Sequence, residues 1–321
     1  MQNKDFRTSI GGQALIEGIM MRGPKKQAIV VRRPDGELET KVEDIKLLKE
    51  KHPLVGLPLI RGAVNFIATM AIGVRAMMFS ASFIPDEDEA ELDDDAEFAP
   101  QPTEEELAAA KAKAEKSDKM LVTVSILLGT LLSVGLFMLL PAFLSGLLKP
   151  FLGAGLWLNI AEGVIRIAIF VLYLWLASHL NEMKRVWEYH GAEHKTIFCY
   201  EKSLPLTVEN VRIQPRRHPR CGTSFLFIVM IVSILVFSVA QWGNMWLRLG
   251  MRLVLLPVVV GVSYEIIKWA GRNDNIVTRI VSAPGKAFQR LTTREPDDGM
   301  IEVAIAALTL VLPDNAEEAT W

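Results

Sequence analysis

The feature that most constrains this chain is a run of twenty residues without a charge, at positions 121–140. An α-helix of that length reaches across the ~30 Å hydrocarbon core of a bilayer. Three further apolar segments, at about 158–180, 224–242 and 251–269, follow it along the chain. The sequence therefore predicts a polytopic, mainly α-helical membrane protein with about four spans in the lipid bilayer.

Basic residues predict which side of the membrane carries the polar segments. Between the second and third apolar segments lie eight of them: Lys184, Arg185, Lys195, Lys202, Arg212, Arg216, Arg217 and Arg220. The loop after the first segment has only Lys149. Because short cytoplasmic loops carry an excess of Lys and Arg, we expect the loop at 181–223 and both termini to lie in the cytoplasm.

The residues before the first apolar run are predicted to be soluble and partly β. Two short strand-like runs flank the turn signal Pro34-Asp35-Gly36. Glycines at positions 11, 12, 18 and 23 indicate either positive φ or a close backbone approach. Tight turns in a small β unit are favoured here over a ligand-binding loop.

A helical period at 57–83 predicts an amphipathic helix. Its two arginines, Arg61 and Arg75, would each cost roughly 2.5–3.5 kcal/mol near the bilayer centre. We therefore expect an interfacial or re-entrant helix, with a buried helix of a soluble domain as the alternative. The acidic segment that follows has too little apolar surface to order itself and is predicted to be a linker.

These patterns divide the chain into five regions. They are a β-containing unit at 1–52, an amphipathic helix at 53–84, an acidic linker at 85–119, a four-span domain at 120–270 and a cytoplasmic tail at 271–321. In the tail, Asp297 and Asp298 are placed to cap an apolar helix at 298–312. That helix is too short to be a fifth span.

Ionisable residues inside the apolar segments are expected to be paired or functional. Glu162 and Arg166 stand one turn apart and predict a self-neutralising ion pair. Tyr264 and Glu265 fall in the inner half of the last segment and are secondary site candidates. A simple ion pair between Glu265 and Lys268 is the alternative interpretation.

The densest set of ligand-type side chains lies in the basic loop. His190 and His194 stand at i and i+4, so on a helix both imidazoles would project from one face and could clasp one zinc ion. Residues 190–194 read H-x-x-E-H, which resembles the inverted zincin motif. That resemblance implies two metal-binding histidines and Glu193 as the general base. A hydrogen-bonded polar cluster at a helix end is the alternative interpretation.

The pattern leaves the rest of the metal shell open. Four residues compete for the third position: Cys199, Glu201, His218 and Cys221. His218 and Cys221 stand at i and i+3, which brings a second pair of ligand-type residues to the same membrane face and favours them. In a cytosolic loop the two cysteines would be reduced thiols.

Several longer motifs cover nearly the full chain: GGQALIEGIMMRGP (11–24), LPLIRGAVNF (57–66), YHGAEHKT (189–196), HPRCGTSF (218–225), SYEIIKW (263–269) and LTTREPDDGMIEVAIAAL (291–308). Together they resemble the YqhQ-like family of bacterial membrane proteins, a family described by a domain of unknown function. The resemblance implies a multi-span protein of the bacterial inner membrane. The family's label, predicted metal-dependent enzyme, implies a bound metal.

These observations support three functional hypotheses. The first is a zinc-dependent hydrolase at the cytoplasmic face, with Cys221 or His218 completing the metal shell and a lipid or membrane-bound substrate. The second is a non-catalytic scaffold, whose β unit and C-terminal helix would dock on a cytoplasmic protein. The third is a transporter formed by a homo-oligomer, although the chain has no paired repeat to support it. Nothing in the sequence predicts a nucleic-acid partner.

Overall fold

The computed structural model of the chain describes residues 6–45, 53–84, 120–121, 123–153, 155–239, 245–273 and 275–320. The predicted acidic linker at 85–119 lies outside these residues. The chain divides into two compact units, which are Met1–Ile84 together with Val171–Trp321, and Pro85–Phe170.

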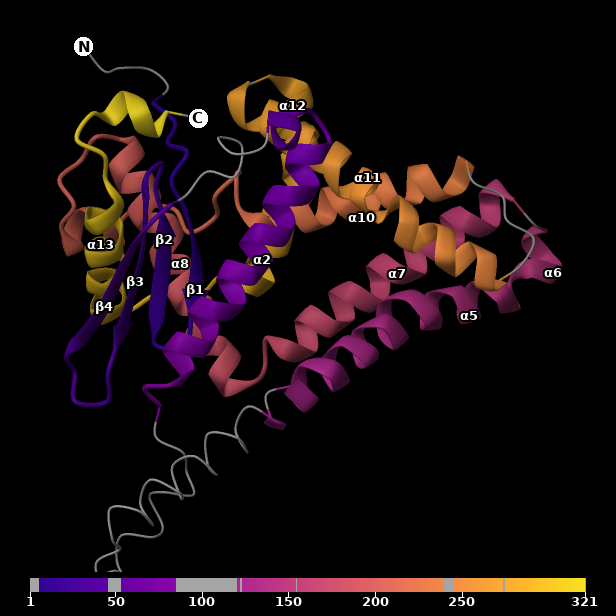
Figure 1. Ribbon diagram of the computed structural model, residues 1–321, viewed down its shortest axis with the longest axis horizontal. Coiled ribbons are helices and arrows are strands. Elements are labelled where there is room, and N and C mark those ends of the chain that lie inside the picture. The colour runs from indigo at the N-terminus through magenta and orange to yellow at the C-terminus, as the bar shows by residue number, and fades with distance from the viewer. Residues whose placement is uncertain are drawn as a thin grey trace, which may run out of the picture. The chain divides into compact units, whose positions relative to one another are not determined.

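The first unit contains a four-stranded antiparallel sheet in the order β1-β2-β3-β4 (Figure 1). The strands are β1 (Gly11–Leu15), β2 (Gly18–Arg22), β3 (Lys26–Arg32) and β4 (Leu38–Asp44). They confirm the predicted β unit, and Gly36, at φ 87°, supplies the left-handed residue in the turn before β4. Gly18 instead allows β2 and β3 to pack closely, because a Cβ there would lie 2.6 Å from the carbonyl oxygen of Val30.

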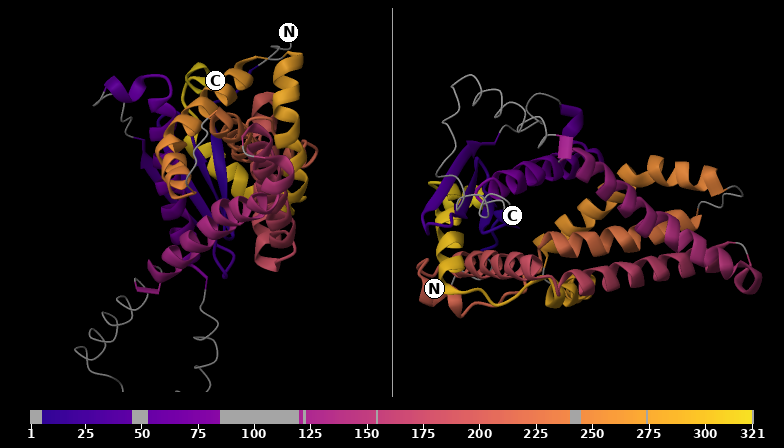
Figure 2. Two further views of the ribbon diagram at one scale, coloured as in Figure 1. Left: turned by 90° about the vertical axis from the view of Figure 1, so that its right-hand side faces the viewer. Right: turned by 90° about the horizontal axis from the view of Figure 1, so that it is seen from below.

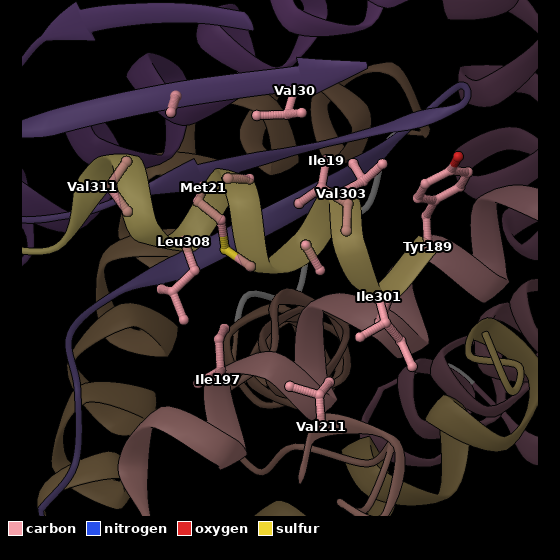
Figure 3. Packing of buried hydrophobic residues seen from close by; sticks show 14 of the residues in the cluster. Ile19, Met21, Val30, Tyr189, Ile197, Val211, Ile301, Val303, Leu308 and Val311 are labelled. Atoms are coloured by element: carbon pink, nitrogen blue, oxygen red, sulfur yellow. The ribbon is translucent and has the colours of Figure 1, made fainter. Parts of the chain in front are cut away.

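One face of the sheet is covered by α8 (Asn181–Glu201) and α13 (Asp298–Val311). Side chains alternate along a strand, so every second strand residue enters the core between sheet and helices. Figure 3 shows the apolar side chains that meet there, among them Ile19, Met21, Val30, Tyr189, Ile197, Val303 and Leu308. Both views of Figure 2 place α13 directly against the strands.

Helix α13 confirms the predicted C-terminal helix. It begins after Asp297, whose side chain accepts a hydrogen bond from the backbone N–H of Met300 at 2.8 Å. α13 and the sheet bury their apolar surfaces against each other.

The other face of the sheet packs against helix α2 (Ile60–Ala81) through Ala76 and its apolar neighbours. On the opposite side of α2 an apolar row stays exposed: Ile60, Ile67, Met70, Val74 and Met78. The helix is long and apolar enough to cross a membrane. Its second half packs on the sheet through Ala76 and its apolar neighbours.

Other helices long and apolar enough to cross a membrane are Thr123–Leu147, Leu156–Ala177 (α7) and Gly250–Arg272, which is part of α11 (Met245–Arg272). With α2 they make four among the described residues. The three helices other than α2 coincide with three of the predicted spans. Together the four confirm a polytopic helical membrane protein. The predicted third span corresponds to α10 (Gly222–Val239), which contains a shorter apolar helix, Gly222–Ser238; residues 240–244 lie outside the described part of the chain.

Two regions contain more helix than the sequence analysis predicted. Most of 181–223, expected to be a loop, forms α8 and the short helix α9 (Val208–Arg212). The tail begins with α12 (Ile276–Thr292), which has Pro284 in its interior. A capping box starts α12, because Asn275 and Thr278 each bond the other's backbone N–H.

Within the second unit, an arginine of α7 bonds a backbone carbonyl of the preceding apolar helix. Arg166 Nε donates to the carbonyl oxygen of Phe137 at 3.0 Å, and Arg166 also bonds Glu162 at 2.8 Å. Phe137 lies in a π-helical turn (Gly135–Leu139), directly before α5 (Leu140–Leu147). The predicted ion pair between Glu162 and Arg166 is therefore confirmed.

Candidate metal centre

Helix α8 carries the H-x-x-E-H residues into the interior of the first unit, and residues 189–197 of it are buried. Gly191 makes this packing possible, because a Cβ there would lie 2.0 Å from the carbonyl oxygen of Arg294. The backbone N–H of Arg294 also donates to the carbonyl of Trp187 at 2.8 Å. The motif therefore faces other parts of the protein rather than solvent.

Backbone carbonyls orient both histidines of the motif. His190 Nδ1 lies 2.7 Å from the carbonyl oxygen of Thr292, at the end of α12. His194 Nδ1 lies 2.6 Å from the carbonyl oxygen of Arg216, in the loop before α10. A carbonyl oxygen only accepts, so each Nδ1 carries a proton, and Nε2 is the nitrogen of each ring that is left to bind a metal. Metal-binding histidines in proteins are commonly oriented in this way.

The two Nε2 atoms converge on Cys221. His190 Nε2 lies 3.1 Å from Cys221 Sγ, and one ligand atom from each of the three residues falls within 4.8 Å of the others. His194 Nε2 is buried and has no hydrogen-bond partner in the described part of the chain. Leaving such an atom unsatisfied is costly. Two imidazole nitrogens and a thiolate suit zinc, so the residues present fit this ion.

Charge within the cluster favours the thiolate that a metal binds. Burial alone raises the pKa of Cys221, but the charges of His190 and His194 outweigh it and hold the pKa well below its usual range. Burial also lowers the pKa of His190, yet Cys221 and Glu193 raise it to about 9.

Glu193 lies beside the three donors. Its Oε1 accepts a hydrogen bond from the backbone N–H of Gly12 at 3.0 Å, and its Oε2 lies 3.9 Å from His190 Nε2. Burial raises the pKa of this carboxyl group, although the two nearby histidines act in the opposite direction. A carboxylate with a raised pKa, fixed next to a metal site, is suited to act as a general base.

The structure places His218 in a second polar cluster instead of among the three donors. His218 Nε2 lies 3.4 Å from Glu201 Oε2, and Glu201 also binds Arg220. The side chain of Gln289, in α12, accepts from the backbone N–H of His218 at 2.8 Å and donates to its carbonyl at 2.7 Å. The rings of His194 and His218 have centroids 5.7 Å apart, so the two clusters adjoin.

The remaining sequence candidates have other partners. Cys199 is buried, its Sγ lies 3.5 Å from the carbonyl oxygen of Pro205, and burial raises its pKa. In α11, Glu265 forms a two-pronged ion pair with Arg61 of α2. The hydroxyl of Tyr264, also in α11, accepts a hydrogen bond from the side-chain amide of Asn65 in α2. These residues hold elements together and do not join the group of three donors.

Sequence reasoning missed the groups that orient the site. The carbonyls of Thr292 and Arg216 are backbone groups, which any residue supplies, so no side-chain pattern marks them. Gly12 and Gly191 did leave a signal, because a glycine inside a strand or helix indicates that another segment approaches its backbone closely. That signal does not reveal which group approaches.

Comparison with known proteins places the chain in a family. The family described as Protein of unknown function (DUF1385) matches residues 57–314. The chain is also 32% identical over 309 residues to Uncharacterized protein YqhQ of Bacillus subtilis (strain 168), an alignment that covers 94% of this chain and 92% of that protein. No solved structure matches it. In agreement with the resemblance of its motifs, the chain belongs to the DUF1385 family, to which it is matched over most of its length.

Proposed function

We propose that this chain is a membrane-embedded, metal-dependent enzyme of the hydrolase type. The observation that carries the proposal is the convergence of His190, His194 and Cys221, whose ligand atoms lie within 4.8 Å of one another. Three protein donors leave one tetrahedral position open, as in catalytic zinc sites. A zinc ion held there would supply Lewis acidity and ease the loss of a proton from water.

Glu193 is the residue proposed to accept that proton. The backbone N–H of Gly12 holds one of its oxygens at 3.0 Å, which leaves the other oxygen on the side of His190. Because burial raises the pKa of Glu193, this carboxylate is a stronger base than an exposed one. Its fixed orientation removes part of the entropic cost of bringing base and water together.

The orientation in the membrane is part of the proposal. The excess of basic residues at 181–223 supports a cytoplasmic position for the metal centre and for both termini, in the inner membrane of a bacterium. The exposed apolar row of α2 would lie in the membrane interface and give access to a lipid or membrane-bound substrate. An alkaline phosphatase fused to the C-terminus should therefore be inactive, and an active fusion would contradict this orientation.

Elemental analysis of the purified chain tests the metal. Wild-type protein is expected to contain about one zinc ion per chain, and His190→Ala and Cys221→Ser are expected to lose it. Cys199→Ser is the matched control, because Cys199 lies outside the group of three donors. A wild-type chain that takes up no zinc, or a Cys221→Ser variant that keeps it, would refute the centre.

A structural metal in a non-catalytic protein is the second candidate, and the burial of the site favours it. His194 is 1% exposed and Glu193 is 5% exposed, so water and a substrate have little access to the site. Glu193→Gln separates the two candidates. If the protein is an enzyme, this variant should keep its zinc and fail to complement a deletion of the gene. If the metal is structural, the variant should keep its zinc and complement fully.

A further inference from the structure

A cavity of about 430 Å³ opens beside the second polar cluster. It is lined by the end of α8, the loop before α10, the end of α11 and the first turns of α12. Its volume lies in the range of small-molecule sites. Glu201 lines it and lies 3.4 Å from His218, whose ring centroid is 5.7 Å from that of His194, so the cavity adjoins the candidate metal centre through the second polar cluster.

The lining is strongly basic. Five cationic side chains contribute to it: Arg7, Lys202, Arg220, Arg279 and Lys286. Among the described residues Glu201 is the sole carboxylate of the lining. Its oxygens already accept from Arg220 and, at 2.9 Å, from the backbone N–H of Thr8. Among the described lining residues, positive charge therefore exceeds negative charge, which favours an anion.

A neutral group holds one of these cations in position. Lys202 donates to the side-chain oxygen of Gln214 at 2.7 Å. This partner fixes the ammonium group without cancelling its charge. A phosphate group in the cavity would gain charge-assisted hydrogen bonds, which are stronger than bonds between neutral groups.

The cavity also lies at the end of a candidate span. Ile267, Ala270 and Gly271 line it and belong to the last two turns of the apolar segment Gly250–Arg272. The end of a spanning helix lies at the level of the lipid headgroups. Thr278, from the first turn of α12, lines the cavity as well, and the N-terminal end of a helix adds positive potential.

We propose that this basic cavity binds the phosphate group of the substrate. The ligand class is a phosphate ester, carried either by an anionic lipid headgroup at the membrane surface or by a soluble molecule. The inference rests on the proposed function, since it assigns a substrate class to the same site.

Thermal unfolding of the full chain in a neutral detergent tests the binding. Dihexanoyl phosphatidic acid is expected to raise the melting temperature in a saturable manner, whereas dihexanoylglycerol, which lacks the phosphate, is not. Glycerol phosphate identifies the source: an equal shift with this soluble ester assigns a soluble substrate, and no shift assigns a lipid. If neither phosphate compound shifts the wild-type chain, the inference is wrong.

A pair of charge reversals in α12 locates the binding. Lys286→Glu should weaken the apparent affinity at least about tenfold, because an attraction becomes a repulsion inside the cavity. Arg290→Glu, one turn further along α12, is the matched control, since Arg290 is exposed and does not line the cavity. Equal affinities for Lys286→Glu and the wild type would also overturn the inference.

Zinc content, measured on the same samples, separates this inference from the proposed function. A chain that holds zinc but shows no phosphate-dependent shift refutes the substrate class alone. A chain that binds the phosphate compounds but takes up no zinc refutes the metal centre, and the cavity then remains an anion site.

Discussion

The backbone N–H of Gly12, in β1, donates a hydrogen bond at 3.0 Å to Oε1 of Glu193, in α8. The contact requires a glycine, because a Cβ at this position would lie 2.7 Å from the carbonyl oxygen of Met20 and 2.9 Å from Cγ of Glu193. The N-terminal sheet is thus part of the candidate site, since it positions the proposed base.

Gly12→Ala is expected to destabilise the protein by about 1–3 kcal/mol, as extra atoms in a well-packed region do. Gly11→Ala is the matched control, because nothing lies within 4 Å of a Cβ at that position. The control should be neutral or stabilising by up to about 1 kcal/mol, since glycine is unfavourable in a strand. Thermal unfolding in detergent measures both variants, and equal losses at the two positions would contradict the close approach of β1 to Glu193.

Much of the fold could be predicted because its signals are local. An uncharged run long enough to span a bilayer, the turn at Gly36 and the cap at Asp297 each depend on a few neighbouring residues. Helix α12 was missed although its polar and apolar residues lie on opposite faces, because Pro284 and Gly285 in its interior are a turn signal. The Asn275–Thr278 capping pair was the local signal that could have revealed its start.

The candidate site, too, could be predicted only where its signals are local. His190 and His194 share one helix, so their spacing alone indicated a common face. The choice between Cys221 and His218 depended on contacts between distant segments. Gln289, 71 residues further along the chain, forms hydrogen bonds with the backbone of His218, and the His218 ring faces Glu201. A single sequence contains no signal for that contact.

Metal binding should protect one cysteine from alkylation. In zinc-free protein, iodoacetamide is expected to modify Cys221 faster than Cys199, because Cys221 is partly exposed and its pKa is lowered, whereas Cys199 is buried and its pKa is raised. Added zinc should block the modification of Cys221, as followed by mass spectrometry. The variant His194→Ala, which lacks one donor, should lose most of this protection. Protection that persists in His194→Ala would exclude a centre shared by the three residues.

Gln289→Met is expected to lower both stability and zinc affinity. The change leaves the buried N–H and carbonyl of His218 without their partner, at a cost of about 1–3 kcal/mol for each group. The same loop supplies Cys221 and the Arg216 carbonyl that orients His194, so a looser loop should release zinc more easily. Chelator competition measures the affinity, with Arg290→Met as an exposed control on the same helix. An unchanged affinity despite lost stability would show that the loop does not position the donors.

The ion pair between Arg61 and Glu265 should tolerate exchange of its members. Arg61 of α2 bonds both oxygens of Glu265 in α11, next to the point where Gly62 packs on Gly261. Arg61→Glu or Glu265→Arg alone places like charges together at the membrane and should cost about 2 kcal/mol or more. The double exchange restores opposite charges and should recover most of that loss in thermal unfolding. A double variant no more stable than the singles would mean that the pair does not join α2 to α11.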